Sequence, residues 1–176
     1  MKKLLLAVIL LALAVAAFVI LRGDPTYADA TDQFTAEELT SDGLVQVTVT
    51  ASAKPYLVVY STYANCPPGA RFSPLLAEFY RTADRSKFQL IIKSYDDTEE
   101  QMIGDLKKYG FGCPVIPYTM TEEWTLPPTE VGVPNLVIID TKTRRVVDER
   151  YHKGIFGLKN IGPEVPLETL RRIASR

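Results

Sequence analysis

Residues 60–80 of the chain, YSTYANCPPGARFSPLLAEFY, decide how the rest of the sequence is interpreted. They continue from an apolar run, Tyr56–Tyr60, that predicts a buried strand. After Cys66, apolar residues recur at helical spacing, and Pro67 and Pro68 suit the first turn of a helix, where a proline loses no intrahelical hydrogen bond. The pattern therefore predicts that Cys66 stands where a strand end meets a helix N-terminus.

A cysteine at this junction has two interpretations. Most free cysteines are small, buried hydrophobic residues with no chemical role. A helix N-terminus, however, presents unpaired N–H donors and a positive partial charge, which favour the anionic form of a sulfur atom placed there. Both interpretations stay open, and the position of Cys66 favours a reactive thiol.

The same segment resembles the redox-site region of thioredoxin-fold proteins, and within them the tryparedoxin and nucleoredoxin branch. That branch typically carries Trp-Cys-Pro-Pro-Cys, a basic residue, Gly, Phe-Thr-Pro and a helix similar to Leu-Ala-Glu-Phe-Tyr. Two positions differ: Asn65 replaces the Trp, and Gly69 replaces the second Cys. The resemblance therefore implies a thioredoxin-like scaffold with a degenerate CPPG motif. The matching residues are Cys66, Pro67, Pro68, Phe72, Pro74 and Leu76–Tyr80.

Elsewhere the chain alternates strand patterns with helix patterns. Thr98 followed by Gln101 has the capping-box pattern of a helix start, and the acidic residues of 96–100 are interpreted as part of that start rather than as a catalytic carboxylate pair. The alternation predicts an α/β layered fold, and the resemblance implies a thioredoxin-like central mixed β-sheet flanked by helices. Strands are expected at 44–50, 56–60, 88–92, 136–140 and 145–151, and helices at 35–38, 67–80, 98–109 and 166–173.

The resemblance also implies where a client would bind. Val133-Pro134 falls where the family has a cis-proline that faces the redox cysteine. Pro67, Pro68, Val133 and Pro134 would then surround a protein thiol or disulfide client at Cys66.

Cys113 is a candidate for the missing second thiol. When the segment 116–118 is aligned with the Leu-Pro-Phe-like segment of the family, Cys113 falls where the branch carries a Trp that flanks the redox site. The resemblance then implies that Cys66 attacks and Cys113 resolves. The alternative of two unrelated cysteines stays open, because a disulfide requires Cα atoms within about 7 Å and prolines fix the course of this loop.

Three functions are compatible with these residues. The first is thiol–disulfide exchange by Cys66 with Cys113 as an atypical resolving thiol. The second is a monothiol that forms mixed disulfides with a client or glutathione, or that cycles through a sulfenic acid. The third is a redox-inactive domain that binds a partner at the groove near Pro134.

Composition excludes other classes. Lys and Arg number 20 against 21 Asp and Glu, with no basic stripe, which argues against nucleic-acid binding. With 2 Cys and 1 His in the chain, a zinc site of the usual Cys/His composition cannot form. No metal or other cofactor is expected.

The N-terminus carries a targeting pattern. Lys2 and Lys3 precede Leu4–Leu21, 18 apolar residues that would reach about 27 Å as a helix, close to the thickness of a bilayer core. Residues 1–30 are therefore interpreted as a hydrophobic helix with a tether, acting as a signal anchor or a cleaved signal, and 31–176 as the thioredoxin-like domain. The domain is expected on the non-cytoplasmic side of a membrane, in a periplasm-like compartment, or secreted if the signal is cleaved.

Overall fold

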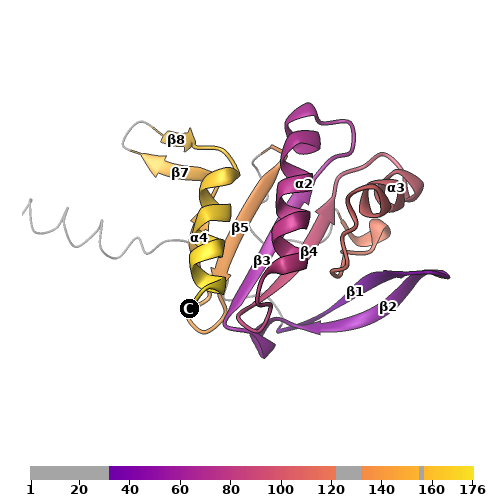
Figure 1. Ribbon diagram of the computed structural model, residues 1–176, viewed down its shortest axis with the longest axis horizontal. Helices are drawn as coiled ribbons and strands as arrows, with labels where there is room; N and C mark the ends of the chain where they lie inside the picture. Colours follow the sequence, from indigo (N-terminus) through magenta and orange to yellow (C-terminus); the bar gives the residue numbers. More distant parts are fainter. Residues whose placement is uncertain (1–31, 122–131, 155–156) are drawn as a thin grey trace, which may run out of the picture.

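The structure, a computed structural model, describes residues 32–121, 132–154 and 157–176 (Figure 1). Its central sheet consists of β3 (Tyr56–Thr62), β4 (Phe88–Ser94), β5 (Asn135–Asp140) and β6 (Arg145–Glu149). The strands lie in the order β4-β3-β5-β6. β3 is parallel to β4 and antiparallel to β5, and β5 is antiparallel to β6, so the sheet is mixed as predicted.

Three helices accompany this sheet: α2 (Pro67–Thr82), α3 (Glu99–Tyr109) and α4 (Glu164–Ala174). In Figure 1, α2 and α4 stand in front of the sheet, and α3 lies beyond β4. Two short 3-10 helices, η1 (Ala51–Ala53) and η2 (Tyr118–Met120), shape the connections. The predicted last strand is shorter than expected and is followed by a separate hairpin of β7 (Tyr151–Gly154) and β8 (Gly157–Asn160).

Alternate residues of β3 enter two hydrophobic cores. Val58 and Tyr60 face the helices, whereas Leu57 and Val59 face the opposite side of the sheet. Complete burial of a side chain of this size stabilises the fold by about 1.5–3 kcal/mol. Because β3 is fixed from both faces, the position of the loop that follows it is fixed as well.

The start of α3 confirms the predicted capping pattern. The Thr98 hydroxyl accepts a hydrogen bond from the backbone N–H of Gln101 at 3.2 Å. The Gln101 side chain reaches back and accepts from the N–H of Asp97 at 3.1 Å, one residue before the helix cap. The helix ends at Gly110, whose φ of 71° is the left-handed conformation that glycine adopts without a steric penalty.

The helix predicted at 35–38 is wrong. These residues belong to β1 (Gln33–Thr40), which pairs with β2 (Gly43–Thr50) along its whole length. Glu37 also exchanges two backbone hydrogen bonds of 2.8 Å with Val115. The helix propensity of four residues amounts to a few tenths of a kcal/mol each, and long-range pairing together with the burial of Ala36 outweighs it.

The expected segment Leu4–Leu21 and the domain boundary at residues 30–31 lie outside the described residues. Within the described ranges, no helix is both long enough and apolar enough to cross a membrane.

Candidate functional site

Cys66 stands at the N-terminus of α2, as predicted. It is the residue that precedes the first helical turn, with φ −86° and ψ 112°, and Pro67 and Pro68 follow it in that turn. Its N–H donates to the carbonyl of Tyr63 at 3.0 Å, and its own carbonyl accepts from Ala70 N–H at 2.9 Å. The side chain is only partly buried, so the sulfur lies at the surface end of the helix.

The peptide bond Val133-Pro134 is cis, which confirms the expectation for this position. The Cys66 thiol donates a hydrogen bond to the carbonyl oxygen of Val133 at 3.5 Å. Two segments that are 67 residues apart therefore meet at the sulfur. Pro134 is buried, whereas Pro67 and Pro68 are exposed beside Cys66.

A buried carboxylate fixes the loop before Cys66. Asp96, 6% exposed, accepts a hydrogen bond from Ala64 N–H at 2.5 Å and another from the Ser94 hydroxyl at 2.7 Å. The carbonyl of Thr62 accepts from Tyr95 N–H at 2.9 Å. The sequence interpretation of Asp96 as helix-start chemistry missed this role, because only the fold brings the end of β4 beside the loop that carries Cys66.

Tyr63 and Tyr118, which we call the rim of the site, both bond to Asp97, the residue that follows this carboxylate. The Tyr63 hydroxyl donates to a carboxylate oxygen of Asp97 at 2.9 Å, and the Tyr118 hydroxyl donates to the backbone carbonyl of Asp97 at 2.6 Å. Asn65, which replaces the Trp of the related motif, is exposed. The rim is therefore polar, and it is tied to the start of α3.

Gly69 marks the missing second thiol. It is buried in the first turn of α2, and a Cβ atom there would lie 3.5 Å from the Cβ of Cys66. It would also lie 3.5 Å from the Tyr63 carbonyl oxygen and 3.6 Å from the Thr62 hydroxyl oxygen, which are ordinary contacts. Cβ atoms joined by a disulfide are about 3.5–4.5 Å apart. The backbone thus retains the geometry of a dithiol site, but one sulfur is absent.

Cys113 does not lie on this rim, so the expectation that both cysteines meet there is corrected. Val115 forms a parallel β-bridge with Ile92 of β4, and Ile92 pairs with Tyr60 of β3. Cys113 precedes this bridge, and the carbonyl of the neighbouring Gly112 accepts a hydrogen bond from the Tyr80 hydroxyl at 3.5 Å. Tyr80 stands in α2 14 residues after Cys66, about 21 Å along the helix axis. A bond would require Cα atoms within about 7 Å.

The environment of Cys113 is also unsuited to catalysis. It is 3% exposed and packs in the core that contains Tyr80 of α2. Burial raises the pKa of the Cys113 thiol, which keeps it protonated. Both cysteines are free thiols. The sequence alignment missed this because it gave the order of residues along the loop but not the level at which the loop joins the sheet.

A small cavity lies in the core between β3, β4 and the helices, next to Thr62 and Asp96 of the segments that lead to the site. The buried Tyr60 hydroxyl is 2.7 Å from the Ser73 hydroxyl, and burial raises the pKa of Tyr60 to about 12. The adjoining cavity has a volume of about 10 Å³, enough for about one water molecule. Asp105 lines the cavity, and its burial raises the pKa of its carboxyl group. The nearby charge of Asp96 raises that pKa further. The polar lining residues are Thr62, Ser73, Ser94, Asp96 and Asp105.

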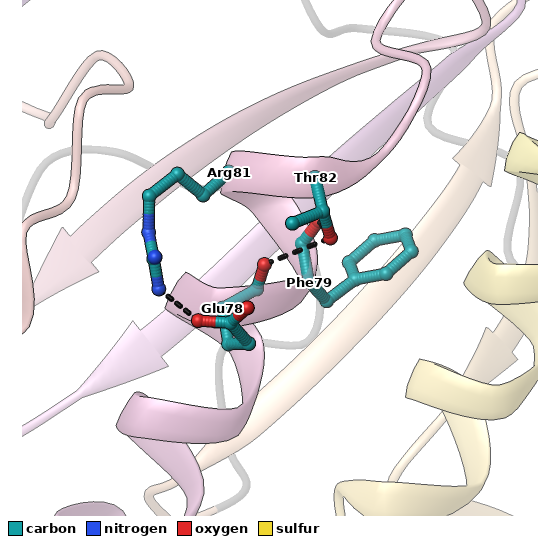
Figure 2. A network of polar contacts seen from close by, with 4 residues as sticks. All are labelled: Glu78, Phe79, Arg81 and Thr82. Carbon is teal, nitrogen blue, oxygen red and sulfur yellow. Dashed lines mark hydrogen bonds and ion pairs between the residues drawn. The ribbon is translucent and has the colours of Figure 1, made fainter.

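At the opposite end of α2, exposed side chains make contacts within the helix itself (Figure 2). Glu78 forms an ion pair with Arg81, and the Thr82 hydroxyl donates to the carbonyls of Glu78 at 3.1 Å and Phe79 at 3.3 Å. An open groove of about 400 Å³ separates this end from α4. It is remote from Cys66, since the helix has 16 residues and is therefore about 24 Å long.

The mixed sheet, the helix opened by Cys66 and the cis-proline opposite the sulfur define a thioredoxin-like fold. The chain is similar to the thioredoxin domain of a thiol-disulfide oxidoreductase from Bacteroides vulgatus, with a TM-score of 0.60 and 16% identity over 86% of this chain and 99% of that one. Thioredoxin from Wuchereria bancrofti gives a TM-score of 0.57 and 23% identity over 69% and 84%. Tryparedoxin II from C. fasciculata gives a TM-score of 0.55 and 17% identity over 68% and 81%.

These similarities establish the fold. No protein-family model matches the chain, and a search among curated proteins finds no significant match.

Proposed function

We propose that the protein exchanges thiols and disulfides through a single reactive cysteine, Cys66. One observation carries this proposal: the Cys66 sulfur, at the N-terminus of α2, lies 3.5 Å from the carbonyl oxygen of Val133 in a cis Val133-Pro134 peptide. The site is partly open to solvent and faces a helix end that stabilises an anion. A buried structural cysteine has neither property.

The proposed reaction needs only a disulfide and a second thiol from outside the chain. The Cys66 thiolate attacks one sulfur of a client disulfide, a new S–S bond forms, and the client's other sulfur leaves as a thiolate. Cys66 and the first client sulfur are then joined in a mixed disulfide. A second thiol attacks this bond and releases Cys66 as a thiolate. The client disulfide is reduced and the incoming thiol is oxidised, so the electrons balance.

The incoming thiol comes from another molecule in this proposal. The chain has 2 cysteines, and Cys113 is buried at a distance from the site, so its role as a resolving thiol is not supported. A protein thiol client or a small thiol such as glutathione has the required chemistry. Pro67, Pro68, Val133 and Pro134 are proposed to contact the client, because the two former follow Cys66 directly in α2 and the carbonyl of Val133, in the cis peptide with Pro134, accepts from its thiol.

A redox-inactive binding domain is the second candidate. Gly69 and Asn65 favour it, because they remove the second thiol and the aromatic residue of the related motif. In that case, the partner would bind at the same groove near Pro134 without covalent chemistry.

The experiment is intact-mass spectrometry of the folded protein after incubation with oxidised glutathione. The exchange proposal expects one glutathionyl adduct on the wild type and on Cys113→Ser, none on Cys66→Ser, and complete reversal by reduced glutathione. If the folded wild type forms no adduct, or if Cys66→Ser forms as much, the binding domain is the better description.

We further propose that Leu4–Leu21 anchors the chain in a membrane, with the domain on the non-cytoplasmic side. The support is the sequence: 18 consecutive apolar residues follow a positively charged N-terminus.

A further inference from the structure

The hairpin of β1 and β2 extends the sheet and leaves β2 at its edge. On its inner side, β1 pairs with Val115, and Val115 in turn pairs with Ile92 of β4. On its other side, β1 pairs with β2, which has no further strand neighbour among the described residues. Figure 1 shows the hairpin along one side of the molecule.

The direction of the backbone groups in β2 follows from the printed hydrogen bonds. The backbone N–H and C=O of Glu37 bond to Val115, so these two groups point away from β2. The backbone groups of the residues on either side of Glu37 in β1 therefore point toward β2. Val47 is the partner of Ala36 in the register, so the backbone N–H and C=O of Val47 point toward β1. The N–H of Ala51, which bonds to Asp32 at 2.7 Å, has the same direction. The backbone groups that point outward therefore belong to Leu44, Gln46, Thr48 and Thr50.

This edge lacks the features that usually prevent strands from pairing with other chains. Exposed edges are normally protected by charged side chains, proline or a bulge. The 8 residues of β2, GLVQVTVT, include no charged residue and no proline, and their pairing with β1 has no irregularity. Val45 is 49% exposed. The edge is therefore competent to accept another strand.

We propose that β2 pairs antiparallel with β2 of a second copy of this chain, with Val47 opposite Val47. This register places Gln46 opposite Thr48 and Leu44 opposite Thr50, so each outward-facing residue meets another one and the hydrogen bonds are exchanged in pairs. On the other face of the joined strands, Val45 lies opposite Val49. No charge opposes a like charge within the paired strands, and the strand is complementary to itself.

The contact leaves the thiol site free. Cys66 contacts Val133, which comes shortly before β5 in the chain. Across the sheet, this position is separated from β2 by β3, β4, the segment of Val115 and β1. A contact made by a single pair of 8-residue strands belongs with the small interfaces that are typical of transient complexes. The dimer is therefore a reversible one, and its test must trap it.

The first test is disulfide trapping of the full chain, purified in mild detergent and carrying Cys66→Ser. With diamide as the oxidant, two thiols lose two electrons and two protons to the diazene, which becomes a hydrazine. Val47→Cys should give a covalent dimer, because opposed residues in this register have Cα atoms about 4.5 Å apart, within the range for a disulfide. Val45→Cys is the matched control, since its two copies would be about 13 Å apart.

The second test uses charge at the exposed positions Gln46 and Thr48. Combining Gln46→Lys with Thr48→Lys puts like charges opposite each other and should abolish trapping through Val47→Cys. Combining Gln46→Lys with Thr48→Glu puts opposite charges together and should preserve it. The proposal is overturned if Val47→Cys gives no dimer, if Val45→Cys is trapped equally well, or if the two charge variants behave alike.

Discussion

Gly69 occupies the position from which a second sulfur would reach Cys66. Because a Cβ at this residue would lie 3.5 Å from the Cβ of Cys66, Gly69→Cys should form an intramolecular disulfide with it under mild oxidation. Intact-mass analysis after alkylation measures this as the loss of both reactive thiols.

Gly69→Ala is the matched control, since it adds the Cβ without a sulfur. Its contacts are ordinary and the residue is helical, so it should stabilise the fold by about 0.5–1 kcal/mol and leave one reactive thiol. Two free thiols in oxidised Gly69→Cys would contradict the geometry described for this turn.

Cys113 gives a prediction at alkaline pH. Burial raises the pKa of its thiol above the ordinary value of 9.0, so above this pH the unfolded chain loses a proton that the folded chain keeps. The free energy of unfolding should therefore fall as pH rises beyond about 9, with a slope approaching about 1.4 kcal/mol per pH unit. Urea unfolding in a Cys66→Ser background measures this dependence. Adding Cys113→Ala should remove that part of the slope, and an unchanged slope would show that the thiol is not the source.

At the scale of elements, the loop between β3 and α2 depends on the end of β4. Asp96→Ala should destabilise the protein by about 1–3 kcal/mol, because the Ala64 N–H and the Ser94 hydroxyl lose their buried acceptor. The rate of Cys66 alkylation should change with it, since Ala64 lies two residues before the sulfur. Chemical denaturation and stopped-flow alkylation provide the two readouts.

Asp97→Ala is the comparison for that variant. It removes the bond from the Tyr63 hydroxyl at an exposed position, so its cost should be below about 1 kcal/mol. Equal destabilisation by the two substitutions would argue against the anchoring role of Asp96.

Elements that depend on local residues could be predicted from the sequence, whereas elements that depend on long-range pairing could not. The start of α2 at Pro67 and the cap of α3 at Thr98 were predictable, because both depend on residues within one helical turn. The strand at residues 33–40 was not, since its pairing with Val115 outweighs a local helix preference. The position of Cys113 depends in the same way on the level at which its segment joins β4.

For the whole molecule, attachment to a membrane is the testable property. The full chain should stay with membranes after washing with high salt, because the apolar segment Leu4–Leu21 can span the bilayer core, whereas the net charge of −1 gives weak electrostatic attraction. Deletion of residues 4–21 should release the domain into the soluble fraction. A mature N-terminus that begins directly after residue 16 or residue 30, where the small-x-small sites Ala14-Val15-Ala16 and Ala28-Asp29-Ala30 end, would show instead that the segment is cleaved.

The connection of the hairpin through Val115 has a consequence for motion within the native state. Glu37 and Val115 share one pair of backbone hydrogen bonds, whereas β3 is paired with β4 and β5 along most of its length. The hairpin can therefore open by breaking that pair and exposing Ala36 and Val49, while the central strands keep their partners. The amide protons of Glu37 and Val115 should accordingly exchange with deuterium through this partial opening, and those of β3 only when the whole domain unfolds.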